Sequence, residues 1–325
     1  MRTRLVALLA PMLVAGCGSS IPNEVPPVSD AQKQTYPPAF LPDVTSRVMT
    51  SSASKRTYQI SVALPDGYTK DHAPYPVLYA ADANAQFGTV VETARLLSFS
   101  KQIPDVVIVG IGYANAGQGF KASGPPRALD LTPTEDQAWV RDFAKESLEQ
   151  GVAAPEGSGG ASAFLSFIRD ELVPSIEQTY NVKHDDRTWY GHSFGGLFGV
   201  YLLFNATDLF NRFVIGSPSL WWNNRAMFAM EESFAAARQP LRARVFFSVG
   251  VLEQQLAPKY PMVTDLQAFV ARLKQRNYKD LEFRTHFFEE ENHLSVVPET
   301  ISRGLRFVYS SAPNPALQPS AQAKR

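Results

Sequence analysis

The sequence has a single cysteine, Cys17, among 325 residues. One thiol cannot close a disulfide within the chain, so no covalent cross-link within the chain stabilises the fold. The folded part of the protein must therefore be held together by the packing of its core.

The sequence also lacks an excess of charge of either sign. The 31 Lys and Arg residues balance the 31 Asp and Glu residues, which leaves a formal net charge of zero. A chain without net positive charge has no bulk attraction for nucleic acid or anionic lipid. Its five histidines form no cluster with the spacing of metal ligands. We therefore expect no nucleic-acid partner, no metal and no cofactor.

Long apolar runs are missing as well, and the apolar stretch at residues 5–13 is too short to span a bilayer. It follows two arginines and ends in Val-Ala-Gly before Cys17, which is the pattern of lipoprotein processing. An ordinary signal peptide with an incidental cysteine is the alternative. We predict a signal peptide at residues 1–16, lipidation of Cys17, and a lipid-anchored place in the bacterial cell envelope, on the periplasmic side. Gly18 in place of Asp favours the outer membrane.

Proline-rich segments flank the central part of the chain. Residues 17–45 are rich in Pro, Ser and small polar residues and are predicted to form a semi-extended tether, and residues 311–325 a disordered tail. Residues 46–310 have the length of one α/β domain. Strands are expected at residues 57–62, 76–81, 105–112, 187–190, 212–215, 244–250 and 281–288, and an amphipathic helix at 161–180.

The most informative segment is residues 191–195, which read Gly-His-Ser-Phe-Gly. A buried strand precedes it and an apolar helix follows it, so Ser193 is expected at a sharp strand-to-helix turn where neighbouring glycines make room. This context predicts a nucleophile elbow, in which the serine hydroxyl is exposed at the end of a sheet and the backbone N–H of Phe194 stabilises an oxyanion.

A serine nucleophile needs a base, and the base needs an orienting acid. In elbow enzymes the chain order is Ser, then Asp or Glu, then His. His293, in a loop after the last expected strand, is favoured over His286, which lies within that strand. Glu253, the first carboxylate after the strand at 244–250, is favoured as the acid over Asp265 and the acidic run at residues 289–291.

The ordered series of motifs resembles the putative-esterase branch of the α/β-hydrolase superfamily, which includes esterase D-like enzymes and the enterobactin siderophore esterases. This resemblance implies an α/β-hydrolase fold with a mostly parallel central sheet flanked by helices. It also implies that Glu253 is the acid and that Asn84 supplies the second oxyanion amide; Ala83 stands where the family usually has Gly. The matching segments are 75–79 with Asp82, 108–112, Arg127 with 130–133, 171–177, 191–196, 217–222, 249–250 and 293–298.

The function expected from the motifs and the resemblance is that of a serine carboxylic ester hydrolase with small-molecule ester substrates, siderophore trilactones being the leading class. An acyltransferase, a generic acyl esterase and a non-catalytic envelope binding protein on the same scaffold remain alternatives. Residues 113–158 are expected to form a long loop that borders the active site. Arg127, with Lys121, and Trp222, with Trp221, are candidate substrate contacts. Arg127 can instead pair with Asp130 to hold the loop, and at least one of the two tryptophans can instead pack in the core.

Overall fold

The structure, a computed structural model, describes residues 41–114, 120–149 and 153–310, and the side chains of 120–124 are not among the described parts. Cys17, the predicted signal peptide and the predicted tail lie outside the described residues. The first strand, β1, covers Val44–Thr50. It begins inside the segment predicted to be a tether up to residue 45, so that boundary was placed too late.

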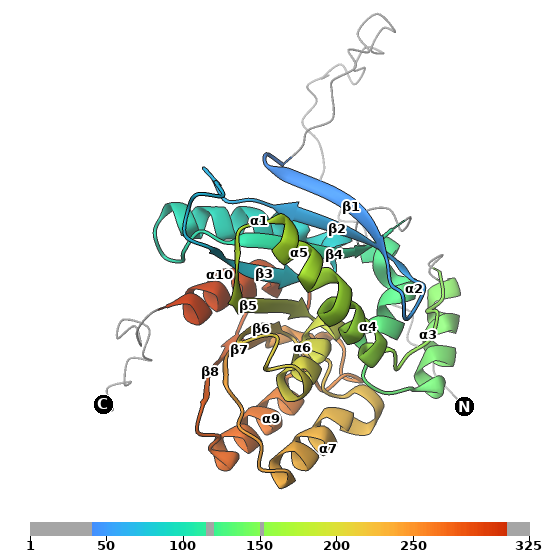
Figure 1. The fold of residues 1–325 in the computed structure, drawn as a ribbon. Helices are drawn as coiled ribbons and strands as arrows, with labels where there is room; N and C mark the ends of the chain where they lie inside the picture. The colour runs from blue at the N-terminus through green and yellow to red at the C-terminus, as the bar shows by residue number, and fades with distance from the viewer. Residues whose placement is uncertain (1–40, 115–119, 150–152, 311–325) are drawn as a thin grey trace, which may run out of the picture. The chain divides into compact units, whose positions relative to one another are not determined.

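A single eight-stranded sheet runs through the domain in the order β1-β2-β4-β3-β5-β6-β7-β8 (Figure 1). β1 pairs antiparallel with β2, and β2 pairs antiparallel with β4. The neighbours in the rest of the sheet, β4-β3-β5-β6-β7-β8, all pair parallel. This confirms the predicted mostly parallel sheet of an α/β-hydrolase fold. The other strands are β2 (Thr57–Ala63), β3 (Tyr75–Ala80), β4 (Val107–Tyr113), β5 (Val182–His192), β6 (Arg212–Gly216), β7 (Ala243–Gly250) and β8 (Leu281–Phe288).

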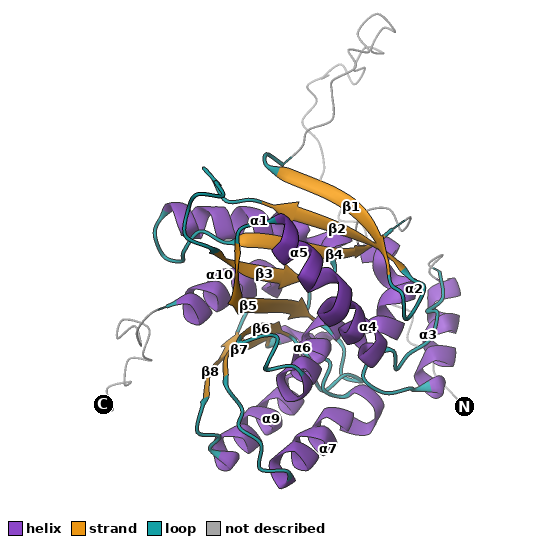
Figure 2. Cartoon of the chain, viewed as in Figure 1, coloured by secondary structure: helices purple, strands orange, loops and turns teal. Residues whose placement is uncertain are grey.

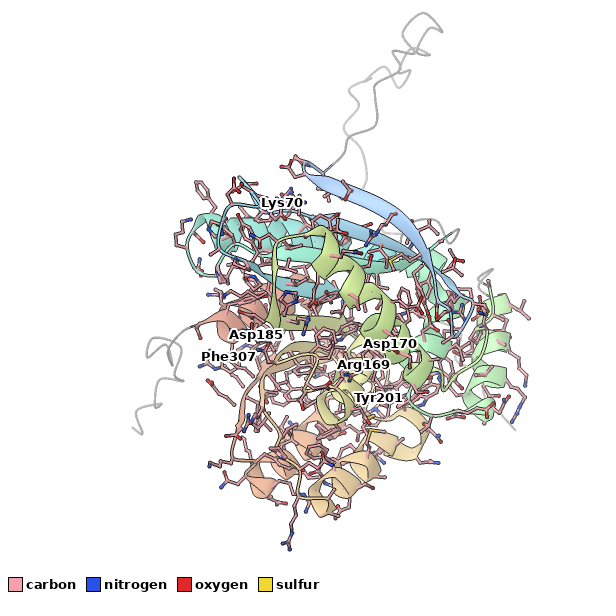
Figure 3. The ribbon with its side chains drawn as sticks, viewed as in Figure 1. Lys70, Arg169, Asp170, Asp185, Tyr201 and Phe307 are labelled. Atoms are coloured by element: carbon pink, nitrogen blue, oxygen red, sulfur yellow. The ribbon has the colours of Figure 1, made fainter. Side chains whose placement is uncertain are left out.

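Two hydrophobic cores cover the two faces of the sheet, because successive side chains of a strand point to opposite faces. On β5, Trp189 belongs to one core and Tyr190 to the other. The Tyr190 side is covered by α1 (Ala83–Phe99) and α10 (Val296–Tyr309), which contact one another. Figure 3 labels Phe307 of α10, whose ring packs on Phe246 of β7 at 6.2 Å between centroids.

The Trp189 side of the sheet is covered by most of the remaining helices (Figure 2). The predicted helix at 161–180 is present and contains a π-helical turn, η2. Long apolar side chains of these helices fill the larger of the two cores. The helices and the turn are α4 (Ala161–Phe167), η2 (Ile168–Leu172), α5 (Val173–Thr179), α6 (Phe194–Asn205), α7 (Trp222–Ala236) and α9 (Met262–Arg276). The short helix α8 (Leu252–Leu256), which follows β7, adds no buried residue to this core.

The segment at residues 113–158 was expected to be a long loop, and this is wrong in part. It contains two helices, α2 (Phe120–Leu131) and α3 (Gln137–Glu149). Pro125 and Pro126 within α2 conceal it in the sequence, because proline normally ends a helix. Its expected place beside the active site is observed, since side chains of both helices line the cavity described below.

Candidate active site

Ser193 lies at the sharp turn between β5 and α6, with φ 61° and ψ −119°. This left-handed backbone is strained for a residue with a Cβ. Gly191 makes the turn possible, since a Cβ there would lie 2.1 Å from the carbonyl oxygen of Gly195. The turn is held by two backbone hydrogen bonds, from Ser193 N–H to the Gly216 carbonyl at 3.0 Å and from Leu197 N–H to the Ser193 carbonyl at 2.9 Å. The local geometry is that of a nucleophile elbow.

Glu253 and His293 form a short hydrogen-bonded pair, with His293 Nδ1 2.6 Å from Glu253 Oε2. Glu253 is 3 % exposed and belongs to α8, directly after β7, while His293 lies in the loop between β8 and α10. The carboxylate is oriented from its other side: Oε1 accepts hydrogen bonds from Ser217 Oγ at 2.5 Å and Gly250 N–H at 2.7 Å. The glutamate is therefore locked in one orientation toward the imidazole.

Asp265 and His286, the alternative candidates for the acid and the base, have partners other than Glu253 and His293. Asp265, on α9, accepts a hydrogen bond from Arg225 at 2.8 Å. His286 lies within β8, where its ring packs against that of Phe288. Ser193, Glu253 and His293 in contrast line one and the same cavity.

The residue before the serine, His192, packs its ring on His293 with 4.5 Å between centroids. Among the described residues, neither ring nitrogen of His192 has a hydrogen-bond partner. Burial, with the neighbouring His293 and Arg127, lowers the pKa of His192 well below its usual value. His192 therefore stays neutral and adds no positive charge beside a protonated His293.

The two residues predicted to supply the oxyanion amides lie in the first turns of two helices, and Phe194 lines the cavity described below. Phe194 is the first residue of α6, and the first N–H groups of a helix have no partner within it. Asn84 lies in the first turn of α1, and its side chain is anchored on Tyr113 of β4: Oδ1 accepts from Tyr113 N–H at 2.7 Å and Nδ2 donates to the Tyr113 carbonyl at 3.2 Å. Asp82, which precedes this helix, has φ 55°. The helix start is thus tied to the neighbouring strand.

Arg127 connects that helix start to the elbow. Its Nε and Nη2 donate to the two carboxylate oxygens of Asp82, each at 2.8 Å, and Nη2 also lies 3.4 Å from the His192 carbonyl oxygen. The guanidinium lies over the Phe194 ring, 5.3 Å from its centroid. The alternative pairing with Asp130 is wrong, since Asp130 binds Arg56 and Tyr58. Both residues belong to α2, and each binds a residue outside that helix: Arg127 binds Asp82, and Asp130 binds Arg56 and Tyr58.

Replacing Arg127 by Met should cost about 3–5 kcal/mol of unfolding free energy, because Asp82 would be left buried without a counter-charge. The double variant Arg127→Met with Asp82→Asn should recover part of this loss. Urea denaturation measures both. The matched control is Arg169→Met, which breaks the more exposed pair with Asp208 and should cost less than about 1 kcal/mol. Equal losses for the two arginines would contradict a buried clamp.

A cavity of about 390 Å³ opens in front of Ser193. Trp222, predicted as a substrate contact, does not line it: the residue is fully buried, its indole N–H donates to the Thr134 carbonyl at 3.1 Å, and Trp221 takes the place at the cavity. Trp222 belongs to the larger hydrophobic core. The sequence reasoning missed Trp139 and Phe143, for which the expected place of the 113–158 segment beside the active site gave a signal. It also missed Ala257, Tyr260 and Met262, for which the sequence gave none. The lining comprises Arg127, Trp139, Phe143, Ser193, Phe194, Ser219, Trp221, Glu253, Ala257, Tyr260, Met262 and His293.

No group of three or more His, Cys, Asp or Glu side chains in the described ranges could hold a metal ion. No helix in the same ranges is long and apolar enough to cross a membrane.

Comparison with known proteins places the chain in a family. The family model described as "Putative esterase" matches residues 51–146 and 123–295. The ferri-bacillibactin esterase BesA of Bacillus subtilis is 32% identical over 274 residues, covering 82% of this chain and 90% of that protein. The siderophore enterobactin esterase of Emericella nidulans is 29% identical, covering 77% and 89%.

Two solved structures are also similar to this chain in fold and sequence. The BES protein from Bacillus cereus has a TM-score of 0.71 and 31% identity, covering 85% of this chain and 98% of that chain. An IroE-like serine hydrolase from Shewanella oneidensis has a TM-score of 0.67 and 27% identity, covering 82% and 80%. The chain therefore belongs to the family described as "Putative esterase", and it is a serine esterase that hydrolyses carboxylic esters.

Proposed function

We propose that this esterase hydrolyses siderophore esters in the cell envelope through a triad of Ser193, His293 and Glu253. The observation that carries the triad is the 2.6 Å pair of His293 and Glu253 at a cavity that Ser193 also lines. The siderophore substrate is supported by the relatives named above, two of which are esterases for named siderophores.

In the proposed reaction, His293 removes the hydroxyl proton of Ser193 as Oγ attacks the ester carbonyl carbon. The negative charge on the carbonyl oxygen is stabilised by the backbone N–H groups of Phe194 and Asn84. His293 then gives the proton to the departing alkoxide, so the alcohol leaves and an acyl-serine forms. A water molecule, deprotonated by His293, attacks the carbonyl carbon of the acyl-serine. The bond from that carbon to Ser193 Oγ then breaks, His293 returns the proton to Oγ, and the carboxylic acid leaves. Glu253 keeps His293 Nδ1 protonated and stabilises the imidazolium.

A substrate panel tests this function. The purified protein is incubated with p-nitrophenyl esters and with catecholate trilactone siderophores, and the products are identified by mass. Stepwise loss of ester bonds from the trilactone is the expected result. Turnover of p-nitrophenyl esters alone would contradict the siderophore assignment, and an acylated product with an added alcohol would indicate acyl transfer.

The proposed place of this activity is the bacterial cell envelope, through a lipid on Cys17 at the periplasmic side of the outer membrane. The support is the sequence pattern of residues 1–17, which resembles a lipoprotein signal. Two or more acyl chains on one residue anchor a protein stably, whereas a single chain gives only marginal binding.

The substitution Cys17→Ser should prevent lipidation and leave a soluble or unprocessed protein. The expected readout is the loss of the protein from the membrane pellet and of labelling by a fatty-acid analogue. The matched control is Ser19→Ala, two residues along the same segment, which should stay in the pellet. A Cys17→Ser protein that is still processed and pelleted, and is released only by detergent, would overturn the lipid anchor.

A further inference from the structure

The last turn of α1 exposes two large apolar side chains, Leu96 and Phe99, which we call the α1 patch. Leu96 is 69% exposed, and Phe99, at 84%, is the most exposed large apolar side chain in the described ranges. Residues three apart on a helix are neighbours on its surface, so the two side chains form one apolar surface. The groove beside Phe99 is lined by charges of both signs, namely Asp66, Arg95, Lys101 and Asp105.

The α1 patch lies at the edge of the sheet opposite to the cavity. The three residues of the proposed triad follow the carboxyl ends of β5, β7 and β8, which run parallel to β3. The helix α1 starts after β3 at that same edge and runs back toward the start of β4, so its last turn lies at the amino edge. There Phe99 lines a groove of about 130 Å³ together with Leu64, which follows β2, and Val106, which precedes β4.

The described part of the chain begins on the same helix. The Leu41 side chain packs against α1 at Gly88, where an added Cβ would lie 3.9 Å from Leu41 Cδ1. Arg95, which directly precedes the patch, donates a hydrogen bond from Nη2 to the Pro42 carbonyl at 2.6 Å. The segment that leads from Cys17 therefore reaches the domain beside the α1 patch.

A second copy of the chain and a lipid bilayer are the two candidate occupants of this patch. A stable dimer buries roughly 1,200–2,000 Å² of surface, far more than two side chains supply. A bilayer requires much less, because residues 18–40 span at most about 80 Å when fully extended and so keep an anchored domain close to the membrane. Tethering raises the effective concentration of the lipid surface, so that even a weak contact is occupied. These arguments favour the bilayer.

We propose that the α1 patch inserts into the lipid interface and holds the domain with its amino edge on the bilayer, so that the cavity faces away from the membrane. This inference rests on the proposed lipid on Cys17 and adds the orientation of the anchored domain. Exposed Phe and Leu side chains enter the boundary between headgroups and acyl chains without spanning the bilayer. In this orientation a water-soluble ester reaches Ser193 from the aqueous side.

The experiment measures which edge of the domain contacts lipid. The full-length lipidated protein is reconstituted into phosphatidylcholine vesicles with ordinary or brominated acyl chains, because bromine quenches tryptophan emission on contact. Phe99→Trp adds one fluorophore to the four native tryptophans, whose emission is measured in the unsubstituted protein. Brominated lipid should lower the added emission about 2-fold or more. The matched control is Leu256→Trp, at a position 70% exposed beside the cavity lining, and it should keep its added emission.

Three results would contradict the inference. Quenching of Leu256→Trp in place of Phe99→Trp would mean that the cavity edge faces the bilayer, and equal or absent quenching of both would mean that no fixed orientation exists. Either result, in a protein that floats with the vesicles, overturns the membrane contact and leaves the lipid anchor standing. A full-length protein that does not float with the vesicles would overturn the anchor and the inference together.

The double variant Leu96→Ser with Phe99→Ser tests the second copy as the occupant. Both side chains are exposed, so turnover of p-nitrophenyl acetate in detergent should be unchanged. The purified Cys17→Ser protein should sediment as a monomer with or without the double substitution. A dimer that the double substitution dissociates, and that the exposed control Val48→Ser on β1 leaves intact, would assign the patch to a second copy and refute the membrane contact.

Discussion

The substitution Ser193→Ala should lower kcat by on the order of 10⁴–10⁶-fold for every ester, because no other group replaces the attacking oxygen. The fold should be retained, since the backbone hydrogen bonds at the turn do not use the side chain. Steady-state kinetics and circular dichroism measure the two effects. A fluorophosphonate probe should label the unmodified protein at Ser193 and leave Ser193→Ala unlabelled.

The control for this substitution is Ser233→Ala, a serine on α7 whose hydroxyl donates to the Ala229 carbonyl at 3.1 Å. It should keep full activity. A second variant, Ser193→Gly, should be as inactive as Ser193→Ala but more stable, because glycine adopts φ 61° without the strain of a Cβ. Retention of more than a few per cent of kcat/KM in Ser193→Ala would remove this serine from the nucleophile position.

The second large effect is expected at the base and its acid. His293→Ala should lower kcat by several orders of magnitude, because both the acceptance and the return of the proton are lost. Glu253→Gln should cost about 10²–10⁴-fold. The hydrogen bonds of Glu253 explain this expected loss of activity. The glutamine carbonyl oxygen would take the place of Oε1, which accepts from Ser217 and Gly250, and so its NH₂ group would face His293 Nδ1.

A donor facing Nδ1 forces the imidazole into the tautomer that carries its proton on Nε2, and that tautomer cannot accept the serine proton. The double variant His293→Ala with Glu253→Gln should be no slower than His293→Ala alone, since the two residues act as one unit. The exposed Glu290→Gln serves as a control close to His293 in sequence. An unimpaired Glu253→Gln enzyme would show that a Ser193–His293 dyad suffices, or that another carboxylate such as Asp265 or Glu291 orients the base.

Local sequence pattern was sufficient for the elements that make the sheet. The strands from β2 to β8 were located, because buried apolar runs and, for the half-buried β8, alternating apolar and polar residues leave little choice of structure. Only β5 begins clearly earlier than predicted, at Val182. The first strand, β1, was missed because most of its side chains are exposed and give no apolar signal. The helices α2 and α3 were missed because prolines, glycines and charges obscure their periodicity.

The sequence by itself determined the elbow at Ser193 and predicted His293 and Glu253 as its partners from chain order and strand ends. The structure brings all three residues to one cavity. Only the tertiary structure decided which groups surround them. The partner of Arg127 is Asp82, 45 residues away, and the tryptophan at the cavity is Trp221 and not Trp222. The aromatic side chains that line the cavity come from α3, the elbow, the residue before α7 and the loop before α9. Contacts between segments so distant in the chain arise from packing, which no local pattern encodes.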